Sequence, residues 1–143
     1  MTNDEIRAFV RRYVDYCEKG NAHDLASCYT DNAHVDSPMF HDLDGRAAIE
    51  KSWADLFRAI GESRIQLDDI IIDNEAGARA VIVFTTKGMH QGMLFGVPAT
   101  GRRVEVRGAF IMKFENGLIA SELRVYDFVG MLVQLGVLKT KAV

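Results

Sequence analysis

Apolar residues near the start of the chain recur at the spacing of an α-helix. From Ile6 to Cys17 they follow an i, i+3, i+4, i+7 pattern, which places them on one stripe of an amphipathic helix. Thr2 and Glu5 have the spacing of a capping box, and Gly20 is a natural end for such a helix. The stripe includes Tyr13, so this phenol is expected to face the interior.

Two more helices and a short strand are expected before residue 62. Asn21 can cap a short helix, and Asp44 can cap a longer one whose apolar side includes Trp53. Gly61 is expected to close that longer helix. Between the two helices, Thr30–Asn32 has the composition of a turn, and Ala33–Asp36 is typical of a short strand.

The rest of the chain alternates in the manner of β-strands. The apolar parity changes between Leu67 and Ile70, which indicates a bulge near Asp68-Asp69. The turn Glu115–Gly117 predicts a hairpin between the last two strands. Phe128–Leu138 is a short apolar segment, expected as a helix at the edge of the sheet. The predicted strands cover residues 65–73, 79–91, 103–114 and 118–127.

Helices that precede a run of antiparallel strands predict one α+β domain over residues 1–143. A strongly bent antiparallel sheet, wrapped around the N-terminal helices, would leave a cone with an opening. Small-molecule sites favour such concave, largely apolar places.

The last predicted strand carries a carboxylate at its end. Ile119, Leu123 and Val125 share one side-chain parity, and Asp127 continues it. Asp127 is therefore either an acid/base group in a pocket or an N-cap for the segment that follows.

Composition narrows the possible partners and the compartment. With 17 Lys and Arg against 20 Asp and Glu, the formal net charge is −3, which argues against nucleic acid as a partner. No apolar run is long enough for a membrane span, and the N-terminus lacks the features of a signal peptide. Only two cysteines are present, outside any C-x-x-C motif. We therefore expect a cytoplasmic protein with no membrane partner.

Two blocks of sequence resemble the NTF2-like superfamily, which has the cystatin-type cone fold, and within it the SnoaL-like polyketide cyclases. The first block is G-M-H-Q-G at 88–92 with G-V-P-A-T-G-R at 96–102. The second runs from Asn116-Gly117 through Tyr126-Asp127-Phe128 to Gln134-Leu135-Gly136. The resemblance implies that Asp127 is the acid/base group of the cyclases.

The N-terminal half is similar to another branch, the ketosteroid isomerases. Arg12-Tyr13-Val14 matches their first-helix tyrosine, and residues 30–38 match the segment that holds their catalytic base. The base position itself is occupied here by Ser37, and the second oxyanion-hole acid falls near the apolar Phe110. Asp36 lies one residue from the base position, and a bend at the following proline would turn it toward the cavity.

Several further side chains suit a pocket. His90 shares a parity with Ile82 and Phe84, so its imidazole is expected to bind a substrate carbonyl, to hold Asp127, or to be only structural. Pocket-wall or lid positions are expected for Trp53, Phe40, Phe57, Met93 and Phe95, although core packing explains the same spacing. No compact metal-ligand or nucleotide-binding motif is present, so we expect no metal and no cofactor.

Two functions follow from these observations. The first is a cofactor-free enzyme in which Asp127 takes a proton α to a carbonyl group and Tyr13 or His90 stabilises the enolate, leading to aldol-type cyclisation or isomerisation of a hydrophobic substrate. The second is a binding or association module without catalysis. In either case the apolar segment 128–138 and the outer face of the sheet predict a homodimer.

Overall fold

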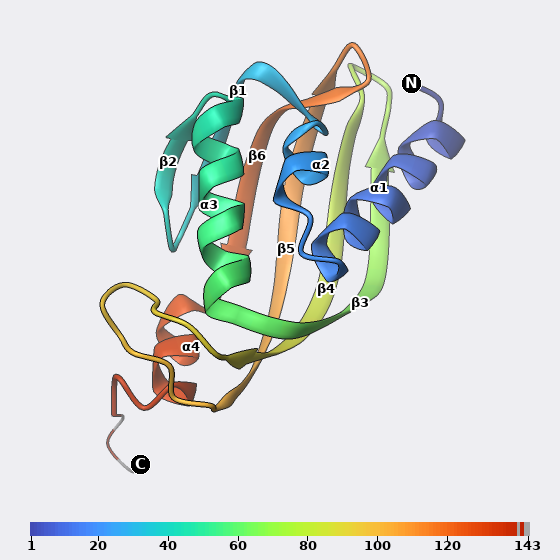
Figure 1. Cartoon of the computed structure of the whole chain (residues 1–143). Coiled ribbons are helices and arrows are strands. Elements are labelled where there is room, and N and C mark those ends of the chain that lie inside the picture. Colours follow the sequence, from blue (N-terminus) through green and yellow to red (C-terminus); the bar gives the residue numbers. More distant parts are fainter. Residues whose placement is uncertain (140, 142–143) are drawn as a thin grey trace.

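The computed structural model describes residues 1–139 and 141, and the elements below are those of this part of the chain. Three helices precede most of the strands, and a short helix follows them (Figure 1). The elements are α1 (Asn3–Glu18), α2 (Ala22–Ala26), β1 (Tyr29–Ser37), β2 (His41–Asp44), α3 (Arg46–Ala59), β3 (Ile60–Asp73), β4 (Arg79–His90), β5 (Arg103–Glu115), β6 (Leu118–Tyr126) and α4 (Phe128–Gln134).

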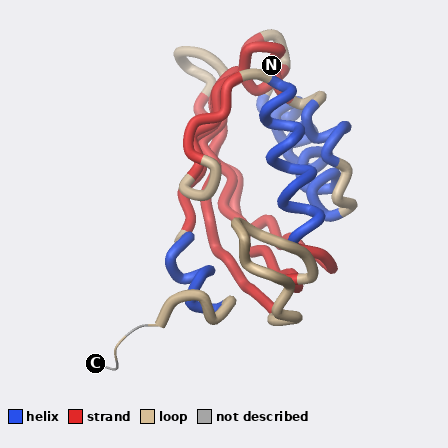
Figure 2. Tube along the Cα trace, turned by 60° about the vertical axis from the view of Figure 1, so that its left-hand side comes forward, coloured by secondary structure: helices blue, strands red, loops and turns tan. Residues whose placement is uncertain are grey.

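The strands form one curled, unclosed sheet in the order β2-β1-β6-β5-β4-β3. Figure 2 shows α1, α2 and α3 on the concave face of this sheet. The α+β class, the bent sheet and the helices packed within it are therefore confirmed. The sheet is mixed rather than wholly antiparallel, because β1 runs parallel to β6.

The ends of the first two helices follow the predictions. Thr2 and Glu5 form a capping box, Asn21 caps α2, and Gly20 has the positive φ of 64° that ends α1. The predicted Asp44 cap of α3 is wrong. Gly45 occupies the N-cap position without a side-chain bond, and the Asp44 carboxylate instead lies 2.7 Å from Nδ1 of His34.

Other boundaries differ from the predictions because strand pairing overrides local turn composition. Strand β1 begins at Tyr29 and so includes the predicted turn at 30–32, while β2 was not foreseen. Helix α3 passes directly into β3 at Ile60, ahead of Gly61. The bulge near Asp68 is confirmed. Leu67 pairs with Phe84 and Asp69 pairs with the adjacent Val83, so Asp68 is an extra residue in β3.

A bulge in β6 decides which side chains of this strand face the interior. Phe114 pairs with Ile119, but Lys113 pairs with Ser121, so one extra residue, Ala120, stands in β6. The parity predicted for residues after the bulge is therefore wrong. Leu123 and Val125 are 43% and 52% exposed, while Glu122, Arg124 and the ring of Tyr126 lie on the concave face.

Helix α4 is attached to the sheet where β5 extends beyond the end of β6. The side-chain amide of Gln134 pairs with the backbone of Glu105, accepting from its N–H at 2.7 Å and donating to its carbonyl at 2.8 Å. Gln134 thus satisfies a strand edge that β6 leaves open. This attachment buries Met131 and Leu135 in an apolar cluster with Met39, Ala59, Leu94 and Val104.

Candidate functional site

A cavity of about 140 Å³ lies between α1, α3 and the concave face of the sheet. Its wall is mostly apolar, and the described residues that line it include no aspartate or glutamate. The aromatic lining residues are Tyr13, Phe40, Trp53, Phe57, Phe84, Phe110 and Tyr126. Arg124 is the one lining residue with a formal charge within the described chain. Such a wall suits a hydrophobic ligand with few polar groups.

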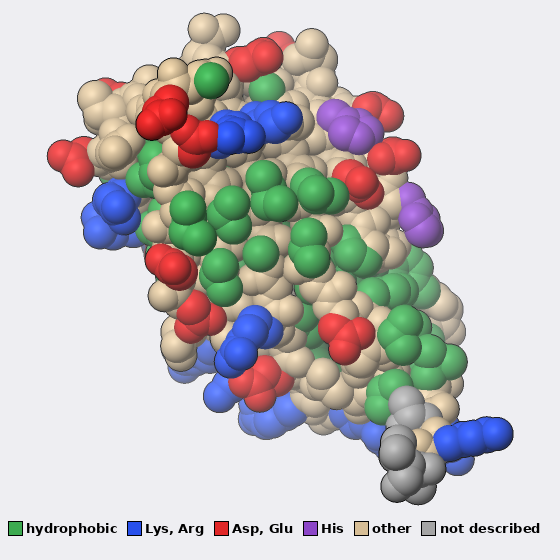
Figure 3. Space-filling model, turned by 180° about the vertical axis from the view of Figure 1, so that it is seen from behind, with side chains coloured by type: hydrophobic (Ala, Val, Ile, Leu, Met, Phe, Trp, Pro, Cys, Tyr) green, Lys and Arg blue, Asp and Glu red, His purple; other side chains and the backbone are tan. Residues whose placement is uncertain are grey.

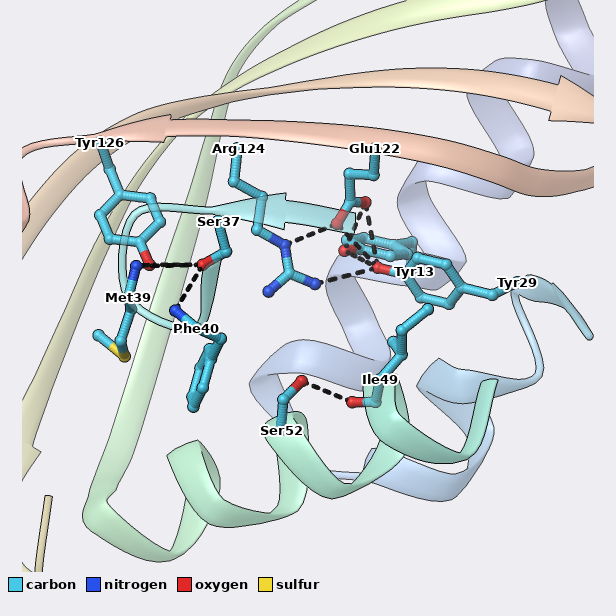
Figure 4. A network of polar contacts seen from close by, with 10 residues as sticks. All are labelled: Tyr13, Tyr29, Ser37, Met39, Phe40, Ile49, Ser52, Glu122, Arg124 and Tyr126. Carbon is cyan, nitrogen blue, oxygen red and sulfur yellow. Dashed lines mark hydrogen bonds and ion pairs between the residues drawn. The ribbon is translucent and has the colours of Figure 1, made fainter. Parts of the chain in front are cut away.

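Four buried polar side chains form what we call the Glu122 network (Figure 4). The Glu122 carboxylate accepts hydrogen bonds from the hydroxyl of Tyr13 at 3.1 Å and from that of Tyr29 at 3.0 and 3.1 Å. Nε of Arg124 donates to the same carboxylate at 2.7 Å, and Nη2 donates to the Tyr29 hydroxyl at 3.4 Å. The carboxylate is thus bonded by three side chains at once.

Burial and neighbouring charges shift the pKa values of the groups in this network. Burial, and then the negative charge of Glu122, raise the pKa of both Tyr13 and Tyr29 well above its ordinary value. Burial alone would lower the pKa of Arg124, but the combined effects of Glu122, Tyr29 and Tyr13 outweigh it and the pKa is raised. Both phenols therefore act as donors, and the guanidinium keeps its charge.

Arg124 connects the network to the cavity. Its guanidinium carbon lies 4.5 Å from the ring centre of Trp53 and 5.2 Å from that of Phe110, so the planar group is held against two aromatic side chains. Nη1 takes part in none of the hydrogen bonds found among the described residues, and Figure 4 shows this nitrogen pointing away from Glu122. A cavity ligand with an acceptor oxygen would complete the bonding of this group.

Ser37, Tyr126 and two backbone amides form a second polar cluster at another part of the wall, which we call the Ser37 group. The Ser37 hydroxyl oxygen accepts from the backbone N–H groups of Met39 and Phe40, each at 3.2 Å. It also lies 3.2 Å from the Tyr126 hydroxyl, to which the Met39 N–H donates at 3.2 Å. Ser37 is buried, whereas the Tyr126 ring lines the cavity.

The structure brings some of the predicted site residues together at the cavity. Tyr13, Trp53, Phe40 and Phe57 all line it. Met93 and Phe95 do not line it. They lie at the tip of the loop after β4 and are exposed, and the Phe95 ring contacts that of Phe40 at 5.7 Å between centres.

Of the two roles left open for Asp127, the N-cap is confirmed and the position in the cavity is wrong, as is the expected inward turn of Asp36. The bulge at Ala120 turns Asp127 outward, where its exposed carboxylate caps α4 by accepting from the Gly130 N–H at 2.7 Å. Asp36 is exposed as well, because Val35 and Ser37 take the inward positions of β1. Neither carboxylate meets Tyr13 in the cavity.

His90 is fully buried but is not part of the cavity lining. Its Nδ1 accepts from the Thr100 N–H at 3.3 Å and lies 3.0 Å from the Thr100 hydroxyl, so the ring fastens the loop between β4 and β5. Nε2 has no partner among the described residues. The imidazole and Asp127 therefore belong to different parts of the structure.

Sequence reasoning missed Glu122, Arg124 and Tyr126. A charged pair at alternate positions of a strand is normally solvated, and the default parity placed these residues outside. The one signal that would have reversed this assignment is the bulge at Ala120, which the sequence does not mark with glycine or proline.

The described residues also bear on metal binding, thiol chemistry and membrane insertion. Among these residues, no group of three His, Cys, Asp or Glu side chains is arranged to hold a metal ion. Cys17 lines the cavity, but burial raises the pKa of its thiol, so it is not a ready thiolate nucleophile. No helix in residues 1–139 is long and apolar enough to cross a membrane.

Solved structures share this fold at low sequence identity. TsrD from Streptomyces laurentii matches with a TM-score of 0.83 and 22% identity, over 96% of this chain and 99% of that one. IdmH from Streptomyces antibioticus matches with a TM-score of 0.73 and 21% identity, over 91% and 97%. A Catenulispora acidiphila protein of ketosteroid isomerase-like fold, solved with trimethylamine, matches with a TM-score of 0.73 and 15% identity, over 90% and 92%.

The sequence itself identifies the family. No curated protein sequence gives a significant match. The family model for SnoaL-like polyketide cyclases, however, matches residues 7–135, which include every element from α1 to α4 that contributes to the cavity. The chain therefore belongs to the SnoaL-like polyketide cyclase family.

Proposed function

We propose that the protein binds a hydrophobic carbonyl compound in the cavity and promotes its aldol-type cyclisation without a cofactor. The observation that carries this proposal is Arg124, a charged donor held in an apolar wall, whose Nη1 makes no hydrogen bond to the described residues. A donor fixed in a dry site stabilises negative charge on a substrate oxygen far better than water does.

Ring closure in this site needs no oxidant or reductant. The α-carbon of an enolised 1,3-dicarbonyl unit forms a carbon–carbon bond to a second carbonyl carbon of the same molecule. The π bond of that carbonyl breaks, and its oxygen takes up the proton that the enol releases. Arg124 would donate to the oxygen on which charge develops, while the aromatic wall holds the two reacting carbons close together.

The absence of a carboxylate from the described cavity lining favours a substrate that enolises readily. Isomerisation of a simple ketone needs a strong, well-placed base, which the outward-facing Asp36 and Asp127 do not provide. A methylene group between two carbonyls is much more acidic, so stabilisation of its enolate suffices. We therefore place cyclisation ahead of isomerisation.

The test uses 1-phenyloctane-1,3,7-trione, in which the C2 methylene lies between two carbonyls and can attack C7 to close a six-membered ring. Liquid chromatography follows its cyclisation. Arg124→Lys keeps a positive charge beside Glu122 but removes the planar guanidinium group with its several N–H donors. We expect this variant to lower the cyclisation rate by about 100-fold. Arg46→Lys is the matched control, because Arg46 contacts the Tyr29 carbonyl and Asp31 but does not line the cavity. A rate for Arg124→Lys within about threefold of wild type would refute the role of Arg124.

The second candidate function is non-catalytic binding of a hydrophobic ligand. It is favoured by the same missing carboxylate, since a cavity without a base can hold a ligand and leave it unchanged. Trp53 lines the cavity and is the only tryptophan of the chain, so its fluorescence reports binding directly. Saturable binding of the triketone with cyclisation no faster than in buffer would establish this alternative.

A further inference from the structure

Tyr126 lines the cavity beside Arg124 and carries a polar hydroxyl group. It is the last residue of β6, and its side chain faces the cavity on the same side of the strand as Arg124, two residues earlier. Figure 4 shows its hydroxyl directed toward Ser37 and the backbone of Met39. The position therefore joins the Ser37 group to the cavity.

Counting donors and acceptors limits how Ser37 and Tyr126 can bond to each other. A serine hydroxyl has two lone pairs and one proton. The Met39 N–H is shared between Ser37 Oγ and the Tyr126 oxygen, and the Phe40 N–H donates to Ser37 Oγ. The two hydroxyls make one bond with each other, at 3.2 Å, so one of their two protons has no acceptor among the described residues. Ser37 is buried and Tyr126 lines the cavity, so the arrangement in which Ser37 donates is the one that leaves the free proton where a ligand can reach it.

This arrangement leaves the proton of Tyr126 without an acceptor in the described chain. The Tyr126 oxygen receives bonds from Ser37 and from the Met39 N–H, and it makes no other hydrogen bond among the described residues. Burial raises the pKa of the phenol above its ordinary value, despite the opposing effects of Ser37, Arg124 and Met39. The hydroxyl therefore keeps its proton near neutral pH.

We infer that Tyr126 donates this proton in a hydrogen bond to a carbonyl oxygen of the ligand, beside the donor that Arg124 supplies, and that Ser37 is the positioning residue for it. The inference rests on the proposed function, because it requires a carbonyl ligand in the cavity. Tyr13 cannot take the same part without leaving the Glu122 network, because its hydroxyl is bonded to Glu122 at 3.1 Å and to the Tyr29 hydroxyl at 2.9 Å. The ligand class is thus a hydrophobic ketone with its oxygen near the end of β6.

The test compares two probes of nearly equal shape, acetophenone and ethylbenzene, of which only the first has a carbonyl acceptor. Binding is followed by Trp53 fluorescence. We expect Tyr126→Phe to weaken acetophenone by about fivefold and to leave ethylbenzene within about twofold of wild type. Tyr16→Phe is the matched control, since Tyr16 is partly buried outside the cavity lining.

A second readout separates positioning from folding. Infrared difference spectra report the C=O stretch of bound acetophenone, which moves to lower frequency when the oxygen accepts hydrogen bonds. We expect the stretch to move to higher frequency in Tyr126→Phe, and by a smaller step in Ser37→Ala, with ethylbenzene still bound in both variants. A merely structural role for Ser37 would leave the frequency unchanged.

The outcomes distinguish the two proposals. If both probes bind to wild type but Tyr126→Phe changes neither the acetophenone affinity nor the C=O stretch, the inference about Tyr126 is overturned and the ligand cavity stands. If neither probe binds to wild type, the proposed function falls and the inference falls with it. If both probes lose affinity equally in Tyr126→Phe, the ring packing rather than the hydroxyl is responsible, and the inference is again overturned.

Discussion

The Glu122 network and the Ser37 group face the same cavity but differ in how their hydrogen bonds are completed. In the Glu122 network the hydroxyls of Tyr13 and Tyr29 bond to one carboxylate and to each other, and Arg124 balances the negative charge. In the Ser37 group the two hydroxyls bond to each other and to backbone N–H groups, so the Tyr126 proton has no acceptor among the described residues. The first arrangement holds Arg124 in place, and the second leaves a donor for a ligand.

We expect the largest loss of stability when the Glu122 network is broken. Replacing Arg124 with Met leaves the buried Glu122 carboxylate without its cation, which should lower the free energy of unfolding by about 3–5 kcal/mol. The double variant Glu122→Gln/Arg124→Met removes both charges and should recover much of this loss. Urea denaturation measures both values. A loss below about 1 kcal/mol in the single variant would mean that the network is not closed as described.

A smaller loss is expected from the Ser37 group. Ser37→Ala leaves the Phe40 N–H without its side-chain acceptor and the Met39 N–H with only the Tyr126 hydroxyl, which should cost about 1–3 kcal/mol of unfolding free energy. Ser52 provides a matched control, because this buried serine only donates to the Ile49 carbonyl within α3. Ser52→Ala should cost about 1 kcal/mol or less. Equal losses in the two variants would contradict the assigned bonding of Ser37.

Two substitutions of Asp127 distinguish its role as a helix cap from a catalytic role. Asp127→Ala should lower the unfolding free energy by about 1 kcal/mol through loss of the α4 cap, and Asp127→Ser should restore most of it. Because the carboxylate is exposed and caps a helix, we expect the serine variant to cyclise the triketone at nearly the wild-type rate. Abolished turnover in a stable Asp127→Ser protein would reinstate Asp127 as the acid/base group.

The pH dependence of binding sharpens the assignment of Tyr126. A phenol donates its proton only in the neutral form, and burial raises the pKa of Tyr126 above the ordinary value of 10.0. The preference for acetophenone over ethylbenzene should therefore stay constant from about pH 7 to pH 10 and fall only as the pH rises through the folded-state pKa. A preference that already disappears near pH 8 would point to a different donor.

We expect substitutions on the outer face of the sheet to have the smallest effect on ligand binding in the cavity. Figure 3 shows apolar side chains in a band across this face, with charged groups beside it. Strand register aligns Ile71, Val81, Ile111 and Leu123 in one row and Val83, Ala109 and Val125 in the next. The homodimer expected from the sequence stays a prediction. Val125→Lys should shift a dimer to a monomer in light scattering and leave acetophenone binding unchanged, whereas a monomeric wild type at micromolar concentration would contradict it.

The sequence was sufficient for the fold because its helical and strand periods are local properties. The stripe from Ile6 to Cys17, the capping box and the turn at Asn116-Gly117 each specify an element without reference to the rest of the chain. The same helical spacing placed Tyr13, Trp53 and Phe57 on inward-facing stripes, and all three line the cavity, whereas Phe40 reaches it from the turn between β1 and β2.

The rest of the site depends on properties that periodicity does not carry. One extra residue, Ala120, exchanges the two faces of β6, so Glu122 and Arg124 turn inward and Asp127 turns outward. The two tyrosine partners of Glu122 lie 93 and 109 residues away in the chain, and no local pattern pairs them with it. The family motifs around His90 and Gln134 were recognised, but here they hold a loop and a strand edge.

The most direct measurement is a crystal structure of the protein with acetophenone. We expect the aromatic ring to lie between α3 and the sheet, and the carbonyl oxygen to lie within hydrogen-bonding distance of the Tyr126 hydroxyl and Nη1 of Arg124. An empty cavity, or a probe whose oxygen points away from β6 while the Tyr126 proton finds another acceptor, would contradict this expectation.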